Sequence, residues 1–221
     1  TGSYQPLRDL SYAIDYHVWR HNPMGYHLAN VILFALNSVL VFYIVLALFN
    51  DLSAALAASF LFAVHPVHTE AVAWVAGRKE VLAGLFFLSS FLLYVRAVET
   101  ENRRPAQYAS ALVLFLCALW SKATSVTLPA LVLLYDLCFV NGMTAKKMLN
   151  RWRVHAPFWV LALITIWINI RTGLERGTVK EFVGGKPAYT VLTMATVFVD
   201  YVRTLIVPVG LRARYLVKPV L

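Results

Sequence analysis

Long stretches without charged residues alternate with short polar segments along this chain of 221 residues. Within each stretch the apolar residues are continuous, which favours helices over the alternating strands of a membrane barrel. The candidate membrane helices cover 28–50, 52–69, 81–95, 106–121, 123–135 and 154–170. We therefore predict an all-α fold, a polytopic integral membrane helical bundle.

The lengths of these segments differ in a way that matters, because a helix needs about 20 residues to cross the hydrocarbon core. Only 28–50 is comfortably long, and 52–69 follows it directly after Asp51, which predicts a tight helical hairpin. The shorter helices span if polar flanks reach the interface or if they end at a cavity. The segment 188–207 contains Asp200 and Arg203, so it either spans or lies along the interface.

Composition excludes a soluble globular domain. Hydrophobic residues make up 60% of the chain and charged residues 14%, whereas soluble domains are about half apolar and about a quarter charged. The net charge of +9 would suggest nucleic acid in a soluble protein. Here the basic residues lie between apolar segments, so we predict membrane lipids as partners and no nucleic acid.

The basic residues are shared between the two sides of the predicted bundle. By parity, Asp51 and the loops 96–105 and 141–153 lie on one side, which holds seven basic residues and which the positive-inside rule makes cytoplasmic. The other side holds at least nine: Arg8, Arg20, Arg78, Lys79, Lys122, Arg171, Arg176, Lys180 and Lys186. This surplus indicates either a function for cations on the outer side or the opposite topology.

The N-terminal segment is rich in aromatic and charged residues. Tyr12, Asp15, Tyr16 and Trp19 recur at the spacing of one helical face, which is typical of an amphipathic helix at the membrane interface. We therefore predict a single membrane domain over 1–221. It has an interfacial segment at 1–26, six or seven membrane helices within 27–207 and a tail at 208–221.

The densest polar cluster runs from His65 through His68 and Glu70, followed closely by Arg78 and Lys79. A metal site is one interpretation, although Glu70 falls off the face that the two histidines share and no HExxH motif is present. Histidines that cap a helix end are a second. The third is substrate binding or proton chemistry, with Arg78 and Lys79 as phosphate ligands.

Four further charged residues each have two possible interpretations. Lys122 lies between apolar segments and either reaches lipid headgroups or contacts an anionic ligand. Asp136, near the opposite end of its helix, is interpreted as an interface residue rather than a catalyst. Asp9 and Asp15 are either solvated on a wet helix face or act as acid or base.

The motifs together resemble one family. In order they are YQPLRDLS at 4–11, DY at 15–16, NPMGYHLAN at 22–30, HPVHTEAVAW at 65–74, GRKE at 77–80, SK at 121–122 and TLP at 127–129. This series resembles the membrane domain of the transmembrane and tetratricopeptide-repeat (TMTC) proteins and their bacterial relatives. The resemblance extends over nearly the whole chain, with two departures: Gln5 stands where the family usually has Arg, and Ala123 where it has an acidic residue.

The resemblance implies a GT-C glycosyltransferase fold and a polyprenyl-phosphate-linked sugar as donor, used on the luminal or periplasmic side. It also implies that the catalytic aspartate lies in a first outer loop upstream of this chain, together with the first span, whereas the tetratricopeptide repeats follow at the C-terminal side. Within this chain it points to lipid-phosphate binding by Arg78, Lys79, Lys122, Arg171 and His65. The remaining catalytic candidates are His68, Glu70 and Asp9, and no metal or further cofactor is predicted.

The expected function is transfer of a mannose-like sugar from polyprenyl phosphate to a protein hydroxyl, with membrane complex subunits as further candidate partners. Two alternatives are a non-catalytic membrane anchor with the same fold and a lipid or solute transporter. The chain contains no Asn-X-Ser/Thr sequence, which favours the bacterial inner membrane over the endoplasmic reticulum membrane.

Overall fold

The computed structural model of the chain describes residues 5–99, 105–140, 151–177 and 187–209. Within these ranges the regular structure is entirely helical, which confirms the predicted all-α bundle. The helices are α1 (Pro6–Trp19), α2 (Pro23–Phe49), α3 (Leu52–Val64), α4 (Thr69–Ala73), α5 (Arg78–Glu99), α6 (Pro105–Ser121), α7 (Leu128–Phe139), α9 (Trp152–Glu175) and α10 (Pro187–Ile206). Short 3-10 turns cover Pro66–His68 (η1), Val75–Gly77 (η2) and Ala123–Thr127 (η3).

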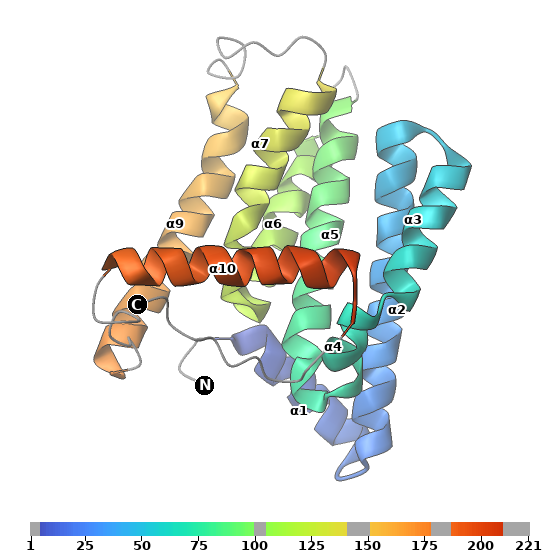
Figure 1. Cartoon of the computed structure of the whole chain (residues 1–221), viewed down its shortest axis with the longest axis vertical. Helices are drawn as coiled ribbons and strands as arrows, with labels where there is room; N and C mark the ends of the chain where they lie inside the picture. Colours follow the sequence, from blue (N-terminus) through green and yellow to red (C-terminus); the bar gives the residue numbers. More distant parts are fainter. Residues whose placement is uncertain (1–4, 100–104, 141–150, 178–186, 210–221) are drawn as a thin grey trace.

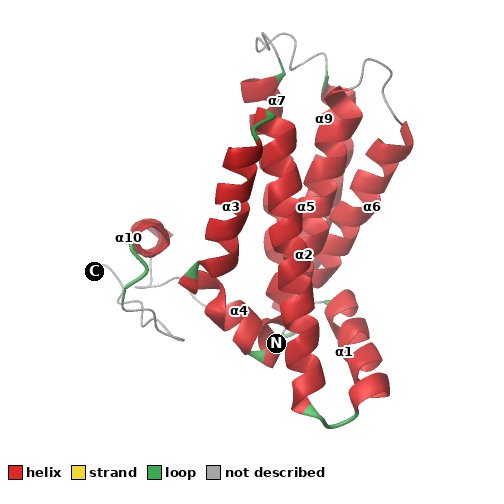
Figure 2. Cartoon of the chain, turned by 90° about the vertical axis from the view of Figure 1, so that its right-hand side faces the viewer, coloured by secondary structure: helices red, strands yellow, loops and turns green. Residues whose placement is uncertain are grey.

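Six helices form the bundle and two others close one of its ends. Figure 1 shows α2, α3, α5, α6, α7 and α9 running along the long axis, with α1 and α4 at the lower end. The turn at Asp51 lies at the upper end with the ends of α5 and α7, as parity predicts. Figures 1 and 2 both show α10 running across the bundle axis.

The chain is an integral membrane protein by the length and composition of its helices. Four helical stretches in the described residues are long and apolar enough to cross a bilayer: Pro23–Phe49, Val75–Val98, Trp152–Glu175 and Ala188–Ile206. The bent pair Leu52–Val64 and Pro66–Ala73 adds a fifth, whereas Pro105–Ser121 and Ala123–Phe139 are shorter apolar helices. The last of the four satisfies the length criterion although it crosses the bundle axis.

Side chains at the helix ends account for the start of α2 and for the predicted hairpin between α2 and α3. The Asn22 side chain accepts a hydrogen bond from Met24 N at 3.1 Å and Pro23 follows as the first residue of α2, where its missing N–H costs nothing. Asn50 ends α2 in the left-handed conformation, with φ of 50°. Asp51 then accepts hydrogen bonds from Ser53 N and Ala54 N at 2.8 and 3.1 Å, so α3 starts at once.

The expected helix over 52–69 is broken at Pro66. Proline has no N–H to continue the ladder, and α3 meets the next helical segment at an angle of 46°. The His65 side chain caps the new turn, since its Nδ1 accepts a hydrogen bond from Val67 N at 3.2 Å. The segment from His65 to Gly77 therefore folds back across the lower end of the bundle.

The apolar core lies between α5, α6, α7 and α9. Its fully buried members include Tyr94, Phe115, Leu128, Val132 and Phe158. Polar contacts join neighbouring helices within the membrane: Ser90 donates to the Ala111 carbonyl at 2.7 Å between α5 and α6, and Asn37 donates to the Val81 carbonyl at 2.9 Å between α2 and α5. These contacts fix the position of α5 along the bundle axis. The first turn of α5 contributes residues to the site described below.

Gly77 lies where the chain enters α5, and it has no room for a side chain. A Cβ added there would stand 2.4 Å from the Ala71 carbonyl oxygen. We expect Gly77→Ala to lower the free energy of unfolding by about 1–3 kcal/mol, because the backbone must shift to relieve the clash. Thermal unfolding in detergent, with Ala76→Ser at the exposed neighbouring position as control, measures this. Equal stability of both variants would contradict the close approach.

Candidate functional site

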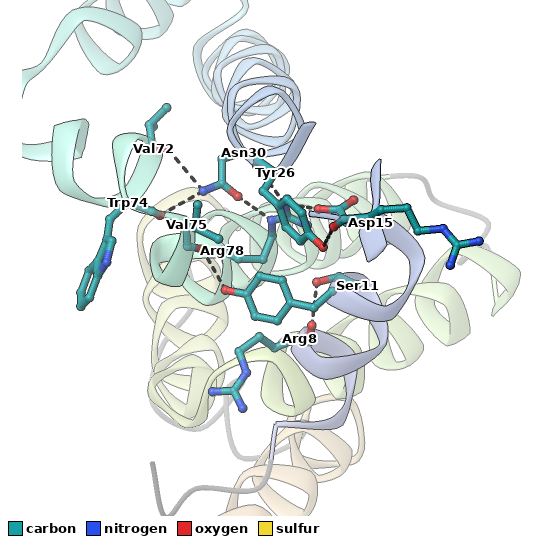
Figure 3. Close-up of polar contacts among 11 residues, drawn as sticks. Arg8, Ser11, Asp15, Tyr26, Asn30, Val72, Trp74, Val75 and Arg78 are labelled. Atoms are coloured by element: carbon teal, nitrogen blue, oxygen red, sulfur yellow. Dashed lines mark hydrogen bonds and ion pairs between the residues drawn. The ribbon is translucent and has the colours of Figure 1, made fainter. Parts of the chain in front are cut away.

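Arg78, at the start of α5, is the centre of a buried polar network at the lower end of the bundle. Its side chain is 2% exposed. Nη2 donates to Asp15 Oδ2 at 2.5 Å and to the Tyr26 carbonyl at 3.0 Å, and Nε donates to Asn30 Oδ1 at 2.5 Å. Figure 3 shows these acceptors converging on the guanidinium from α1 and α2. The network therefore joins three helices at one residue.

Asn30 and Tyr12 extend this network to the end of α4 and to the residues between α4 and α5. Asn30 donates to the carbonyls of Val72 and Trp74 at 3.3 and 3.1 Å. The Tyr12 ring centroid lies 5.5 Å from the Arg78 guanidinium carbon, and its hydroxyl donates to the Val75 carbonyl at 2.8 Å. Burial raises the pKa of Tyr12, against the lowering effect of Arg78, so the phenol keeps the proton that it donates.

The buried position of Asp15 corrects the expectation that it is solvated on a wet helix face. Asp15 is 8% exposed and forms an ion pair with Arg78. Helix α1 itself is present as predicted, but its polar face is divided: Tyr12 and Asp15 turn towards the bundle, whereas Tyr16 and Trp19 are exposed. Sequence spacing alone does not show which residues of one face meet a neighbouring helix.

An open hollow lies beside this network, between the first three turns of α5 and the turn after α6. Its volume is about 300 Å³. Its lining combines charges, hydroxyls and apolar groups: Glu80, Ala83, Gly84, Phe87, Lys122, Thr124, Ser125 and Thr127. Lys122 Nζ forms an ion pair with Glu80 Oε2 across the hollow, and the two side chains are 28% and 35% exposed. The hollow is therefore polar at one side, apolar along α5 and open to its surroundings.

Among the predicted phosphate ligands, only Lys122 lines this hollow. Arg78 points into the protein, where its network already holds it. Lys79 is half-buried in the first turn of α5. Arg171 is exposed on α9, with its guanidinium carbon 5.5 Å from the Trp167 ring centroid. The structure thus separates residues that the sequence grouped by charge alone.

The two histidines have structural neighbours. Because His65 Nδ1 accepts the hydrogen bond from Val67 N, the proton of its ring is on Nε2, which lies 3.0 Å from the Leu205 carbonyl oxygen of α10. His68 is half-buried, with its ring centroid 4.4 Å from that of Phe62 and 5.2 Å from that of Phe34. These positions match the helix-capping interpretation for His65 and give His68 an aromatic environment.

The other two catalytic candidates are exposed and do not line the hollow. Glu70 lies on the surface of α4. Asp9 lies on α1 and pairs with Arg8 Nη2 at 2.7 Å, with 63% of its side chain exposed. Within the described residues, no group of three or more His, Cys, Asp or Glu side chains is placed to hold a metal ion.

Asp136, which the sequence places near the end of its helix, is fully buried among the helices. Its Oδ2 accepts a hydrogen bond from the Tyr94 hydroxyl at 3.0 Å and lies 3.1 Å from His155 Nε2 and 3.5 Å from Arg151 Nη1. This cluster joins α5 and α7 to the start of α9. The cluster lies where α5 and α7 end and α9 begins, the upper end of the bundle in Figure 1, whereas the beginning of α5 lines the hollow.

Glu80, Asn30 and Tyr12 take part in these arrangements, and the sequence analysis assigned them no role. Glu80 is 42 residues from Lys122, and Asn30 is 48 residues from Arg78. The sequence did contain a signal for Glu80. A charged residue next to an apolar segment needs a partner of opposite charge, and Glu80 is the only acidic residue of the GRKE motif.

Comparison with known proteins yields a consistent set of relatives. The chain is 40% identical over 144 residues to protein O-mannosyl-transferase TMTC3 of Homo sapiens, covering 64% of this chain and 16% of the relative. It is 35% identical over 172 residues to protein O-mannosyl-transferase TMTC2 of Mus musculus, covering 75% and 20%. It is 34% identical over 168 residues to protein O-mannosyl-transferase TMTC4 of Homo sapiens, covering 67% of this chain and 23% of the relative.

The similarity covers most of this chain but less than a quarter of each of these relatives. No protein-family model matches the chain, and no solved structure matches it significantly. The relatives nevertheless agree in name and in level of identity, as the motif order predicts. Over 64–75% of its own length, the chain is therefore TMTC-like in sequence.

Proposed function

We propose that the protein containing this chain is a glycosyltransferase that moves a mannose-like sugar from a polyprenyl phosphate to a protein hydroxyl. The names of the relatives support the reaction class, the sugar and the protein acceptor. The hollow beside Lys122 supports the lipid-linked donor, and it is the observation that carries the proposal. By the family resemblance, the reaction takes place on the luminal or periplasmic side.

The lining of the hollow matches the two parts of such a donor. Lys122 and the hydroxyls of the η3 turn offer a cation and hydrogen-bonding groups to a phosphate. Ala83, Gly84 and Phe87 offer an apolar wall to the first isoprene unit. A volume of about 300 Å³ lies at the lower end of the range for small-molecule pockets. It suits a phosphate head with a short part of the chain better than a whole polyprenyl group.

The chemistry that this arrangement supports is displacement of a phosphate from the sugar carbon. Negative charge develops on the leaving phosphate, and a fixed ammonium at Lys122 stabilises it more than it stabilises the bound donor. A carboxylate that accepts the proton of the attacking hydroxyl is required as well. The resemblance attributes that carboxylate to a part of the protein upstream of this chain. Direct attack opposite the leaving group inverts the sugar configuration.

In this scheme Arg78 is a positioning residue. It holds the first turn of α5 against α1 and α2, and Glu80 of that turn faces Lys122. Arg171 and His65 do not line the hollow. A role for them in phosphate binding therefore requires that donor binding move them towards it. We propose the bacterial inner membrane as the location, because the chain contains no Asn-X-Ser/Thr sequence.

Lys122→Gln tests the proposal. We expect it to weaken binding of a polyprenyl-phosphate sugar by about 10- to 100-fold, because a charge-assisted contact to phosphate is lost. Binding and sugar transfer are measured with purified full-length protein in detergent, and Arg203→Gln on the exposed face of α10 is the matched control.

Three other results would decide against the proposal. If Lys122→Gln left both binding and transfer unchanged, the hollow would not hold the donor. If the wild-type protein bound the donor without any transfer to protein acceptors, a non-catalytic anchor would be favoured. Movement of substrate across proteoliposomes without a covalent product would favour a transporter.

A further inference from the structure

Two of the ion pairs at the lower end of the bundle differ in character. Asp15 and Arg78 are buried, with side chains 11% and 2% exposed, and the guanidinium has further acceptors in Asn30 and the Tyr26 carbonyl. Glu80 and Lys122 are 35% and 28% exposed and line an open hollow. Opening the first pair leaves buried charges without a partner, whereas opening the second exposes them to solvent or ligand.

The position of Glu80 conflicts with anion binding as long as its pair with Lys122 is closed. The hollow then contains one positive and one negative side chain among its described lining residues, so an entering phosphate meets a carboxylate beside the only cation. Two anions that share one ammonium repel each other. The ligand must therefore replace the carboxylate, and a half-buried ion pair at an open hollow, which we expect to stabilise the protein by only about 1 kcal/mol, permits this.

We propose that Glu80 is an exchangeable counterion for Lys122: it neutralises the ammonium in the empty hollow, and the phosphate of a polyprenyl phosphate displaces it on binding. This inference rests on the proposed function, because it assigns the phosphate to the same hollow. It adds a residue that sets ligand affinity by competition. When the phosphate leaves, the carboxylate returns to Lys122, which favours release of the anionic product.

Removing the charge of Glu80 should change the affinity for phosphate in opposite directions, depending on whether the carboxylate competes with the ligand or supports the hollow. Glu80→Gln keeps the size of the side chain and removes its charge, so under our proposal it tightens phosphate binding. A residue that merely supported the hollow would weaken binding when changed. The expected gain is about two- to fivefold, which is the loss of an exposed ion pair expressed as a ratio of dissociation constants.

The experiment uses purified full-length protein in detergent with farnesyl phosphate as the probe. Farnesol, which has the same chain without the phosphate, and inorganic phosphate alone separate recognition of the lipid from recognition of a free anion. We expect Glu80→Gln to bind farnesyl phosphate about two- to fivefold more tightly than wild type, with unchanged affinity for farnesol. Glu175→Gln, at an exposed glutamate on the last turn of α9, is the matched control.

The possible outcomes separate this inference from the proposed function. If Lys122→Gln loses binding and Glu80→Gln gains it, both stand. If Lys122→Gln loses binding but Glu80→Gln is unchanged or weaker, the exchange is overturned and the phosphate site stands. If Lys122→Gln has no effect, both are overturned. Glu80→Ala provides a second removal of the charge, judged by the same sign, should the glutamine variant fold poorly.

Discussion

Arg78→Met is expected to lower the free energy of unfolding by about 3–5 kcal/mol, because it leaves the Asp15 carboxylate buried without its counterion. Asn30 and the Tyr26 carbonyl lose their donor in the same change. Arg78→Lys keeps the charge but not the fork of the guanidinium, whose Nε and Nη2 reach acceptors in different directions. We therefore expect this variant to be destabilised as well, by a smaller amount.

Thermal and denaturant unfolding in detergent measure this effect, with Arg203→Met on the exposed face of α10 as the control. The double variant Arg78→Met, Asp15→Asn should lose less stability than the sum of the single variants, by about 0.5–3 kcal/mol, because the two side chains interact directly. A variant of Arg78 that unfolded like wild type but no longer bound farnesyl phosphate would show that Arg78 is a phosphate ligand instead.

Asp136→Asn is the second change with a large expected effect, about 3 kcal/mol of lost stability. It removes the negative charge that faces Arg151 and His155, while the shape of the side chain is kept. Helix α9 depends on this cluster, since most of its length is exposed and its first turns make the polar contacts to α5 and α7. The effect should therefore be concentrated at the start of α9.

Hydrogen exchange of the backbone amides of α9 measures this local loss, alongside global unfolding. Asp51→Asn is the matched control, because Asp51 is an exposed helix cap and asparagine caps a helix equally well. Tyr94→Phe removes only one hydrogen bond to Asp136 and should cost about 1 kcal/mol. Unchanged exchange in Asp136→Asn would mean that apolar packing alone holds α9.

The fold was largely predictable because its signals are local. Charge-free segments located α2, α5 and α9, and the single charged residue at Asp51 located the hairpin. Boundaries differed where a short-range contact decides them: α2 starts at Pro23 because Asn22 caps it, and the expected helix over 52–69 breaks at Pro66. Each of these boundaries had a visible signal, a cap or a proline, that hydropathy does not measure.

The candidate site was predictable only in part, because its contacts are long-range. Lys122 was singled out as a lone cation next to apolar segments, and it lines the hollow. Asp15 was expected on a wet face and Asp136 at an interface, and both are buried. A buried carboxylate is recognised by its partner, and the partner of Asp15 lies 63 residues away. Nothing in the spacing of one helix shows which neighbour it will face.

The amino-acid sequence by its own patterns established the membrane class, the helical content and the similarity to TMTC proteins, because hydropathy and motif order are properties of the chain itself. Only the packing of helices showed that two cations at the same end of the bundle differ in use. Arg78 is enclosed by α1 and α2 and its charge serves the fold. Lys122 is half-buried at an open hollow and is paired with Glu80, the carboxylate that we propose a phosphate displaces. The difference is one of burial, which depends on residues far apart in sequence that meet only in the folded bundle.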